Sequence, residues 1–235
     1  MSNSCELFLE VAQDPATLGW ASDAVSEHHY LHKPPDRRSR PLCYVVRLAT
    51  HGYIGCLWFG RPESTRCFHG TLTYGSRQDA AAGRAAYDRW EVLNLSRVWL
   101  CSSVQPGGDL YRPDFLPGFV DRQGHFRSTL ASTVIRLALA RVGFDYLRLH
   151  PPVFVDEPYA IRAVLSYCDT RLHRGTIYRA AGWLLGRRNA AGLETWWTGA
   201  TAPLLKCQDR EIRRLAAVCP RSVRIRDAQR QLFSE

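Results

Sequence analysis

The sequence predicts an α+β fold, in which a mixed central sheet contains one parallel strand–helix–strand crossover and is flanked by helices. Two neighbouring runs of β-branched and aromatic residues predict a pair of strands within 42–60. An apolar run at 90–101 is followed by a polar loop and an amphipathic stretch at 126–142, which is the order of a parallel crossover. Two short runs joined by a turn at 183–198 predict a second strand pair.

The N-terminal part is predicted to be mainly helical, over residues 5–31. The loop that follows, 33–41, is rich in proline, which fixes φ and restricts the preceding residue, so no helix or central strand crosses it. Strands are then expected at Leu42–Leu48 and Tyr53–Gly60, joined by a short turn. Residues 84–89 are predicted as a short helix or loop.

The crossover helix at 126–142 is predicted from an apolar stripe with helical spacing. Ser128 or Thr129 stands where the helix cap is expected. The stripe consists of Leu130, Val134, Leu137 and Ala138. Beyond it, the prediction places strands at Tyr146–Leu149, Trp183–Arg187 and Leu193–Thr198, and helices at 158–166 and 176–181.

Length and composition bound the class of protein. A chain of 235 residues can bury the core of one good-sized domain, and 46% hydrophobic with 23% charged residues excludes wholesale disorder. No apolar run is long enough to span a bilayer, and the first ten residues lack the layout of a secretory signal, so we expect a soluble, intracellular protein. Residues 1–200 are expected to form the domain, with 201–235 as a basic extension packed on it or appended to it.

The charge balance indicates an anionic partner. The net charge is +9, and the basic residues are nearly all arginine, whose planar fork pairs with phosphate groups. Nucleic acid, a phosphorylated cofactor, or both are therefore expected. Arg37, Arg38 and Arg40 in the proline-rich loop would suit DNA phosphates, and a solvated charged loop is the alternative. Codon usage in a GC-rich genome would explain the preference for arginine over lysine, but not the net charge.

The sequence predicts no metal site and no disulfide framework. The eight cysteines include no Cys-x-x-Cys pair, so they are expected to be reduced and mostly buried. His28 and His32 can share one face of a helix, but no further ligand is placed by spacing to complete a metal site.

Three further features are candidates for chemistry. Glycine and arginine near the start of the crossover helix can form an anion site from free backbone N–H groups, although the loop matches no known phosphate-loop spacing. The segment 166–183 is dense in polar groups, with Asp169 and His173 four residues apart, and forms either a proton-transfer site or a helix cap with salt bridges.

Arg97 is the third of these features, because it lies within an otherwise apolar strand. A buried guanidinium needs a partner, since unpaired burial of a charge is very costly. It therefore pairs with a carboxylate such as Asp169 or Glu91, or it faces an anionic substrate, and the sequence slightly favours the second.

At these residues the sequence resembles the Mom family of DNA-modification proteins of Mu-like phages and prophages, which is itself similar to the GCN5-related N-acetyltransferase (GNAT) superfamily. The resemblance spans roughly residues 20–200. It is carried by His29–His32, Leu95–Leu100, Gly124–Ser132, Ser166-Tyr167-x-Asp169 and His173-x-Gly175-Thr176-Ile177-Tyr178, the last of which continues to Gly182-Trp183.

The resemblance implies conversion of adenine in duplex DNA to N6-carbamoylmethyl-adenine, which shields phage DNA from restriction in the cytoplasm of the bacterial host. Double-stranded DNA and a small-molecule donor, acetyl-CoA or another acyl-CoA-like compound, are the implied partners, and whether a metal takes part is left open. The donor is implied to lie in the V-shaped split between parallel strands, near Trp99–Cys101 and Tyr146–Leu149, with its pyrophosphate over the turn at Gly124–Ser128. The implied donor-binding residues are Trp99, Leu100, Cys101, Gly124, Arg127 and Thr129.

The chemistry of this reaction suggests roles for the remaining residues. Adenine N6 is a poor nucleophile, so a general base and a well-held electrophile are both needed. The adenine must also leave the DNA stack. Asp169 is the predicted base or orienter and Tyr178 the acid toward the leaving group, with His173 as a further candidate for moving the proton. Arg97 and Ser128 would position donor or substrate, and His29, Tyr30 and Tyr167 would contact the adenine.

Two readings from other classes stay open. A GNAT-type acetyltransferase acting on a protein or small amine would bind acetyl-CoA and have no affinity for DNA. A non-enzymatic DNA-binding protein would bind duplex in a salt-sensitive way and tolerate changes at Asp169 and Tyr178, but it would not need the polar density of 166–183. A homodimer would suit a duplex binder, although no residue pattern shows one.

Overall fold

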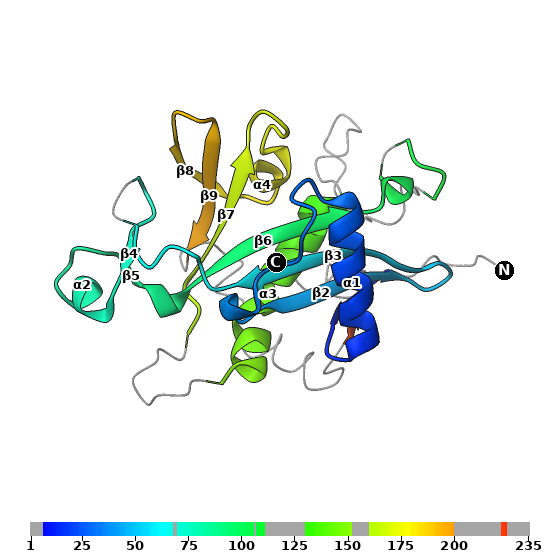
Figure 1. Cartoon of the computed structure of the whole chain (residues 1–235), viewed down its shortest axis with the longest axis horizontal. Coiled ribbons are helices and arrows are strands. Elements are labelled where there is room, and N and C mark those ends of the chain that lie inside the picture. Colours follow the sequence, from blue (N-terminus) through cyan, green and yellow to red (C-terminus); the bar gives the residue numbers. More distant parts are fainter. Residues whose placement is uncertain are drawn as a thin grey trace, which may run out of the picture.

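One sheet organises the molecule (Figure 1). The computed structural model describes residues 7–67, 70–105, 107–110, 130–151 and 160–199, together with the strand at 222–224. Within these residues the sheet has eight strands in the order β10-β1-β2-β3-β6-β7-β9-β8, and all neighbouring pairs are antiparallel except β6 and β7. The strands of the sheet are β1 (Leu7–Val11), β2 (Leu42–Leu48), β3 (Gly52–Gly60), β6 (Val92–Leu100), β7 (Ala163–Asp169), β8 (Leu184–Arg188), β9 (Leu193–Gly199) and β10 (Ser222–Arg224).

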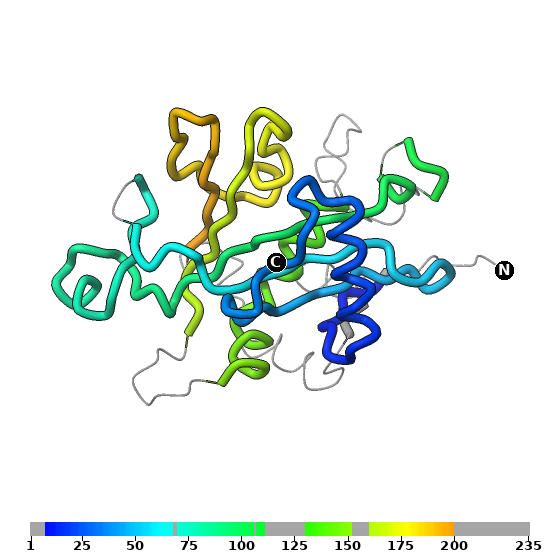
Figure 2. Tube along the Cα trace, viewed as in Figure 1, coloured from blue at the N-terminus to red at the C-terminus, as the bar shows by residue number. Residues whose placement is uncertain are grey.

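The helices lie on both faces of this sheet, and a small two-stranded unit projects from one end (Figures 1 and 2). The projecting unit pairs β4 with β5 in parallel and carries helix α2. The helices are α1 (Pro15–His28), α2 (Arg77–Ala81), α3 (Leu130–Leu149) and α4 (Thr176–Ala180), and the short strands are β4 (Tyr74–Gly75) and β5 (Tyr87–Asp88). Single 3-10 turns lie at η1 (Arg37–Ser39), η2 (Arg89–Glu91) and η3 (Ser102–Val104).

The alternation of side chains along β2 explains why both faces are covered. Cys43 and Val45 pack against α1 with Ala21 and Val25, whereas Tyr44 and Val46 belong to the cluster that includes the buried face of α3. Successive residues of a strand point to opposite faces, so an unbroken apolar run needs an apolar layer on each side. The sandwich of α1, sheet and α3 is the result.

A buried ion pair lies where α3 packs on the sheet. Arg141 Nε is 2.9 Å from Asp145 Oδ2, and the Tyr44 hydroxyl donates to the same carboxylate oxygen at 2.8 Å. All three side chains are buried. The ion pair lies within α3, and the hydrogen bond from Tyr44 of β2 connects it to the sheet. Removal of one partner would leave a charge in a low-dielectric interior.

The strand predictions at 42–48, 53–60, 90–101, 183–187 and 193–198 are confirmed to within a residue or two, as is the short helix at 176–181. The mixed α+β architecture with one parallel crossover is also confirmed. The crossover helix is confirmed from Leu130 onward, and the expected start at 126–129 lies outside the described residues. Residues 84–89, predicted as a short helix or loop, contain the short strand β5 and lead into η2, and the helix of this region, α2, lies earlier, at 77–81, where Ser76 and Asp79 make a capping box.

Three predictions were wrong. Residues 5–31 are not mainly helical throughout, because 7–11 form β1, which pairs with β2 and β10, and the helix starts after the cap Asp14, which accepts from Thr17 N at 2.8 Å. Residues 146–149 are not a strand but the last turn of α3, in which Tyr146 continues the buried face. The predicted helix at 158–166 is instead β7 from residue 163, since a short apolar run fits a buried strand as well as a helix.

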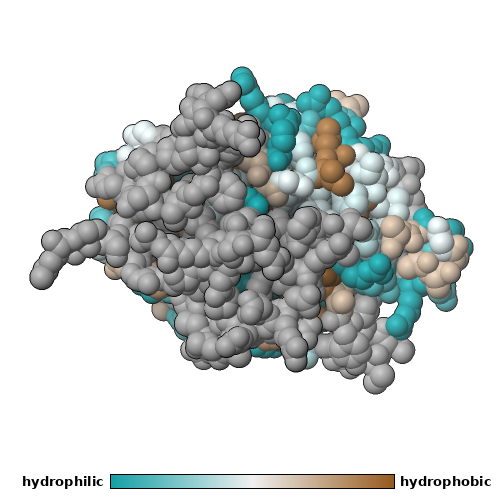
Figure 3. All heavy atoms as spheres, turned by 180° about the vertical axis from the view of Figure 1, so that it is seen from behind, coloured by the Kyte–Doolittle hydropathy of each residue, from teal (hydrophilic) through white to brown (hydrophobic). Residues whose placement is uncertain are grey.

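Two further expectations concern the C-terminal extension and membrane-spanning segments. Most of the proposed extension, 201–235, lies outside the described residues, and Ser222–Arg224 pairs with β1 at the edge of the sheet. Among the described helices, none has both the length and the apolar character needed to cross a membrane. Seen from behind, the described surface is largely hydrophilic, with hydrophobic residues in small separate patches (Figure 3).

The buried pair on α3 gives a stability prediction. Replacing Asp145 by alanine leaves the Arg141 guanidinium uncompensated, so we expect the free energy of unfolding to fall by about 3–5 kcal/mol. Arg84→Ala, which removes an exposed ion pair with Asp79, should cost less than about 1 kcal/mol. Urea unfolding followed by circular dichroism measures both, and equal losses would contradict the assignment of Asp145 as an anchor of α3.

Candidate functional site

The two parallel strands of the sheet separate after a short paired stretch. β6 and β7 pair only at Val92–Ala163, Leu93–Val164 and Asn94–Leu165. Beyond these residues β6 continues along β3, β7 continues along β9, and the two diverge (Figures 1 and 2). The register between β3 and β6 shifts at the same level, where Ser96 is the extra residue. Such a bulge bends and twists its strand, which fits the point of separation.

Ser166 closes the base of this split. Its Oγ lies 2.7 Å from the Leu95 carbonyl oxygen and 2.9 Å from the Tyr178 hydroxyl oxygen, so it links β6, β7 and α4. The serine has one proton, and the carbonyl can only accept, so the Tyr178 hydroxyl donates to Ser166. Tyr178 is buried, and burial raises its pKa above the usual value. Its proton is therefore held at neutral pH.

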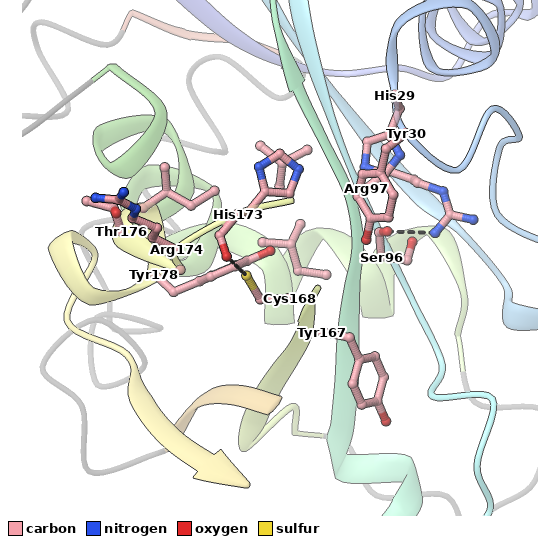
Figure 4. A pocket seen from close by; sticks show the side chains of 14 residues that line it. His29, Tyr30, Ser96, Arg97, Tyr167, Cys168, His173, Arg174, Thr176 and Tyr178 are labelled. Atoms are coloured by element: carbon pink, nitrogen blue, oxygen red, sulfur yellow. Dashed lines mark hydrogen bonds between the residues drawn. The ribbon is translucent and has the colours of Figure 1, made fainter. Parts of the chain in front are cut away.

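A cavity of about 210 Å³ lies in the split and is called here the split pocket (Figure 4). It is lined by residues from the end of α1, the middle of β6, the end of β7, and the loop that leads into α4. Six of the eight residues predicted as catalytic line it, although they are up to 149 positions apart in the chain. These six are His29, Tyr30, Arg97, Tyr167, His173 and Tyr178.

Arg97 brings a buried cation to the split pocket. Its side chain is 9% exposed, and it donates from Nε to the Lys33 carbonyl at 2.9 Å and from Nη1 to the Ser96 carbonyl at 2.6 Å. Burial lowers its pKa, yet a guanidinium stays protonated at neutral pH. Within the described part of the chain, no carboxylate forms an ion pair with it.

Both carboxylates that the sequence offered to Arg97 are held by other arginines. Glu91 pairs with Arg162 at 3.2 Å, and Asp169 pairs with Arg171 at 2.6 Å. Of the two alternatives left open by the sequence, pairing with Asp169 or Glu91 is therefore ruled out. Arg97 instead lines the split pocket.

His29 is a neutral hydrogen-bond donor beside this arginine. Burial, with the positive charge of Arg97 next in importance, lowers its pKa from 6.5 to about 4, so the ring is uncharged at neutral pH. The backbone N–H of Leu31 donates to Nδ1 at 3.2 Å, so the proton of the neutral ring belongs on Nε2. Stacked on this ring at 4.5 Å is Tyr30, whose own ring meets His173 edge-on at 5.5 Å.

The loop after β7 places His173 opposite these rings. The backbone N–H of His173 donates to the Asp169 carbonyl at 2.9 Å, and Cys168 Sγ donates to the His173 carbonyl at 3.5 Å. Gly175 ends the loop with φ of +64°, and a Cβ there would lie 2.8 Å from the Trp196 ring, so both the conformation and the space require glycine. Among the described residues the His173 ring has no hydrogen bond, which leaves it able to accept a proton from a ligand.

Asp169 itself lies outside the split pocket. Both of its carboxylate oxygens accept from Arg171, and these bonds lower its pKa to about 2. A carboxylate that holds protons so weakly is a poor base at neutral pH. Its contribution to the site is to stabilise the turn that carries His173.

Some of the residues predicted to bind or position the donor lie outside the described residues, and others are described but do not line the split pocket. Gly124, Arg127, Ser128 and Thr129 lie outside the described residues. Trp99, Leu100 and Cys101 are described, but none lines the split pocket. Trp99 stacks on His28 at 4.9 Å, Leu100 is in the core, and Cys101 Sγ lies 2.9 Å from Ser103 Oγ.

The second wall of the split is also different from the expected one. Since Tyr146–Leu149 belong to α3, the strand that faces β6 across the split is β7. Tyr167 and Cys168 of β7 stand where the sequence had placed the 146–149 strand.

The proline-rich loop runs alongside the site. Its first residue, Lys33, accepts the hydrogen bond from Arg97, and Asp36 Oδ1 caps the turn by accepting from Arg38 N at 2.7 Å. Arg37 and Arg38 are exposed, whereas Arg40 donates to the Pro151 carbonyl at 3.1 Å. The exposed pair is therefore available to an anionic ligand next to the split pocket.

The described residues contain no cluster of three or more metal-ligating side chains. His32 Nδ1 lies 3.1 Å from the Ser26 carbonyl, and the stacking on Trp99 accounts for His28. Five described cysteines are free thiols.

Comparison with known proteins shows distant structural likeness. No protein-family model matches the chain, and no curated protein matches it. The chain is similar to the spermidine/spermine N-acetyltransferase SpeG from Vibrio cholerae, with 10% identity over 86% of this chain and 99% of that one and a TM-score of 0.42. A structure of the V. cholerae spermidine N-acetyltransferase with CoA and spermine gives 10% identity, 83% and 96% coverage, and a TM-score of 0.42. TofI in an apo form gives 14% identity, 86% and 94% coverage, and a TM-score of 0.43.

The depressed pKa of His29 gives a pH prediction. The unfolded chain takes up a proton there near pH 6.5 and the folded chain only near pH 4, so stability falls as the pH drops between these values. We expect the wild type to lose about 1–2 kcal/mol more over this range than His29→Gln, after allowance for solvent screening.

Urea unfolding at pH 7 and pH 4.5 measures the difference, and His51→Gln in the exposed turn between β2 and β3 is the matched control. If His29→Gln and His51→Gln showed the same pH dependence as the wild type, His29 would not be neutral in the folded protein.

Proposed function

We propose that the chain is a GNAT-type transferase whose split pocket receives an adenine from double-stranded DNA and carries a carbamoylmethyl group onto its N6. The observation that carries this proposal is the pocket between the separating parallel strands, in which a buried arginine without a carboxylate partner faces histidine and tyrosine side chains.

The first support is that distant segments of the chain meet at one pocket. The segments that resemble the Mom family at His29–Tyr30, Leu95–Val98, Tyr167 and His173–Tyr178 are far apart in the sequence, yet residues from each of them line this pocket. Structural roles in the core would not require these particular polar segments to meet at one cavity.

The second support is the shape and chemistry of the pocket. About 210 Å³ is below the range of about 300–1,000 Å³ usual for drug-sized ligands and suits one flat group. Tyr30, stacked on His29, offers a ring for a base to stack on, and the Nε2–H of His29 can donate to a ring nitrogen.

The third support is the charge around the pocket. Arg97 and Arg174 line it and no aspartate or glutamate does, while exposed Arg37 and Arg38 lie on the proline-rich loop, whose first residue, Lys33, accepts from Arg97. DNA phosphates suit such a rim. A polycationic amine would need acidic residues there, so this lining favours DNA over a polyamine as the acceptor substrate.

An acyl-CoA-like donor fits the open edge of the split. Beyond Asn94, β6 has no strand partner on its β7 side among the described residues. Apart from the Leu95 and Ser96 carbonyls, which accept from Ser166 and Arg97, its backbone groups there can bind an extended chain that carries amides. When bound, the donor would supply the methylene carbon that carries the carbamoyl group, and the bond from this carbon to the donor's leaving atom would break as its bond to N6 forms. Residues 124–129, which the resemblance assigns to its pyrophosphate, lie outside the described part.

The residues of the split pocket then divide the proton transfers. Formation of the bond at N6 releases a proton, and His173, the side-chain type most often used as a general base, accepts it. Tyr178 keeps its proton because it is buried; it turns this proton from Ser166 to the leaving atom, while the Ser166 hydroxyl turns its own proton to the Tyr178 oxygen. Arg97 stabilises negative charge that develops on the donor. Asp169 positions His173 through the backbone turn.

Nucleoside mass spectrometry of plasmid DNA from a bacterial host that expresses the chain tests the function. We expect a deoxyadenosine species heavier by a carbamoylmethyl group. His173→Ala and Arg97→Gln should each lower its formation about 10²-fold or more, since a base and a charge-stabilising group are lost.

Asp169→Asn is the informative comparison, because it weakens the pair with Arg171 and leaves the His173 ring in place. It should reduce modification less than His173→Ala does, and the opposite order would return the role of base to Asp169. If adenine stayed unmodified while the purified chain transferred acetyl groups from acetyl-CoA to an amine, the acetyltransferase reading would replace this one.

A further inference from the structure

A second cavity, of about 480 Å³, lies behind the split pocket, between the segment 64–74 and the strands β7, β8 and β9. It is called here the arm cavity. The residues that matter for the argument are Arg66, Tyr74, Tyr167, Arg187, Asn189 and Thr195, all of which line it. The volume falls in the range of about 300–1,000 Å³ that is usual for small-molecule sites.

The outer wall of the arm cavity is held against the sheet by specific contacts. Cys67 and Tyr74 exchange two backbone hydrogen bonds, at 2.7 and 2.8 Å, which turn the segment back on itself. Trp197 Nε1 donates to Thr71 Oγ1 at 2.8 Å, which ties the segment to β9. At Gly70 a Cβ would come 3.1 Å from the Gly186 carbonyl, so the wall reaches β8 as closely as a backbone can.

Tyr74 lies in the inner wall of this cavity. The residue is 1% exposed, and burial raises the pKa of its hydroxyl, which has the hydroxyls of Tyr167 and Ser64 as hydrogen-bonding neighbours. Because the hydroxyl oxygen is itself buried, Tyr74 offers a ligand its ring and not a hydrogen bond.

Two arginines give the arm cavity a positive charge. Arg66 and Arg187 line it, and neither forms an ion pair within the described residues. The neighbouring Arg188, in contrast, pairs with Glu194 at 3.1 Å and is not part of the lining. No aspartate or glutamate lines the cavity, so its charge suits a phosphate.

Tyr167 connects the two cavities. It lines both, and its ring points away from the other labelled side chains of the split pocket (Figure 4). A ligand in the arm cavity would therefore contact the Tyr167 ring, while the backbone of Tyr167 lies at the split pocket.

We propose that the arm cavity binds a nucleotide. Its phosphate pairs with Arg66 and Arg187, and its base or sugar lies against Asn189 and Thr195, which also line the cavity. The proposal rests on the proposed function in one respect: in DNA this nucleotide is a neighbour of the adenine held in the split pocket.

Isothermal titration of the full-length chain with deoxyadenosine 5′-monophosphate, in the absence of any donor, tests this proposal. We expect binding that is at least about tenfold weaker for deoxyadenosine, which lacks the phosphate, and for the double variant Arg66→Gln/Arg187→Gln. Arg188→Gln is the matched control and should bind as the wild type does.

Several results would overturn the proposal. These are the absence of nucleotide binding at millimolar concentration, equal binding by the wild type and the double variant, and inorganic phosphate binding as tightly as the nucleotide. If binding were lost in Arg97→Gln but not in the double variant, the nucleotide would lie in the split pocket instead. Because the titration needs neither donor nor DNA modification, it can succeed where the mass-spectrometry test fails, and the reverse also holds.

Discussion

The separation of β6 from β7 after the Asn94–Leu165 pair is the constraint from which the site follows. A parallel pair that stayed in register would bury the middle of both strands against each other and leave no cavity. Here β3 and β9 each satisfy one of the two strands on its outer side, so the inner edges can part without loss of the sheet. Ser166 spans the fork and fixes Tyr178 to it, which places the hydroxyl of α4 at the base of the pocket.

The buried charge of Arg97 sets the electrostatics of this pocket. The two acidic residues that the sequence suggested as partners, Asp169 and Glu91, are paired with exposed arginines, and Glu63 raises the pKa of Arg97 without forming an ion pair with it among the described residues. The same charge helps to keep His29 neutral. A neutral donor beside a cation, with the His173 ring across the pocket, gives three polar groups with different tasks. Electrostatic groups that are in place before the substrate binds cost no reorganisation during the reaction.

The two cavities extend this arrangement across β7. Tyr167 lines both, and arginines without acidic partners stand at each of them among the described residues. Some of the arginines that contribute to the net charge of +9 therefore line two adjoining cavities. A single ligand with a flat group and a neighbouring phosphate would use both, which is the chemistry of a nucleic acid strand.

The sequence by itself determined the strands at 42–48 and 53–60, the β6 run, and the residue types of the site, because periodicity, turn residues and polar groups in apolar runs are local properties. It also pointed to six residues that do meet, from His29 to Tyr178. Only the tertiary structure decided that 7–11 and 163–169 are strands, since a short apolar run takes its conformation from the strands beside it. The tertiary structure likewise decided that Asp169 belongs to Arg171, and that Arg66 and Arg187 share a cavity. Partners of this kind are set by distances in space, which the order of residues along the chain does not contain.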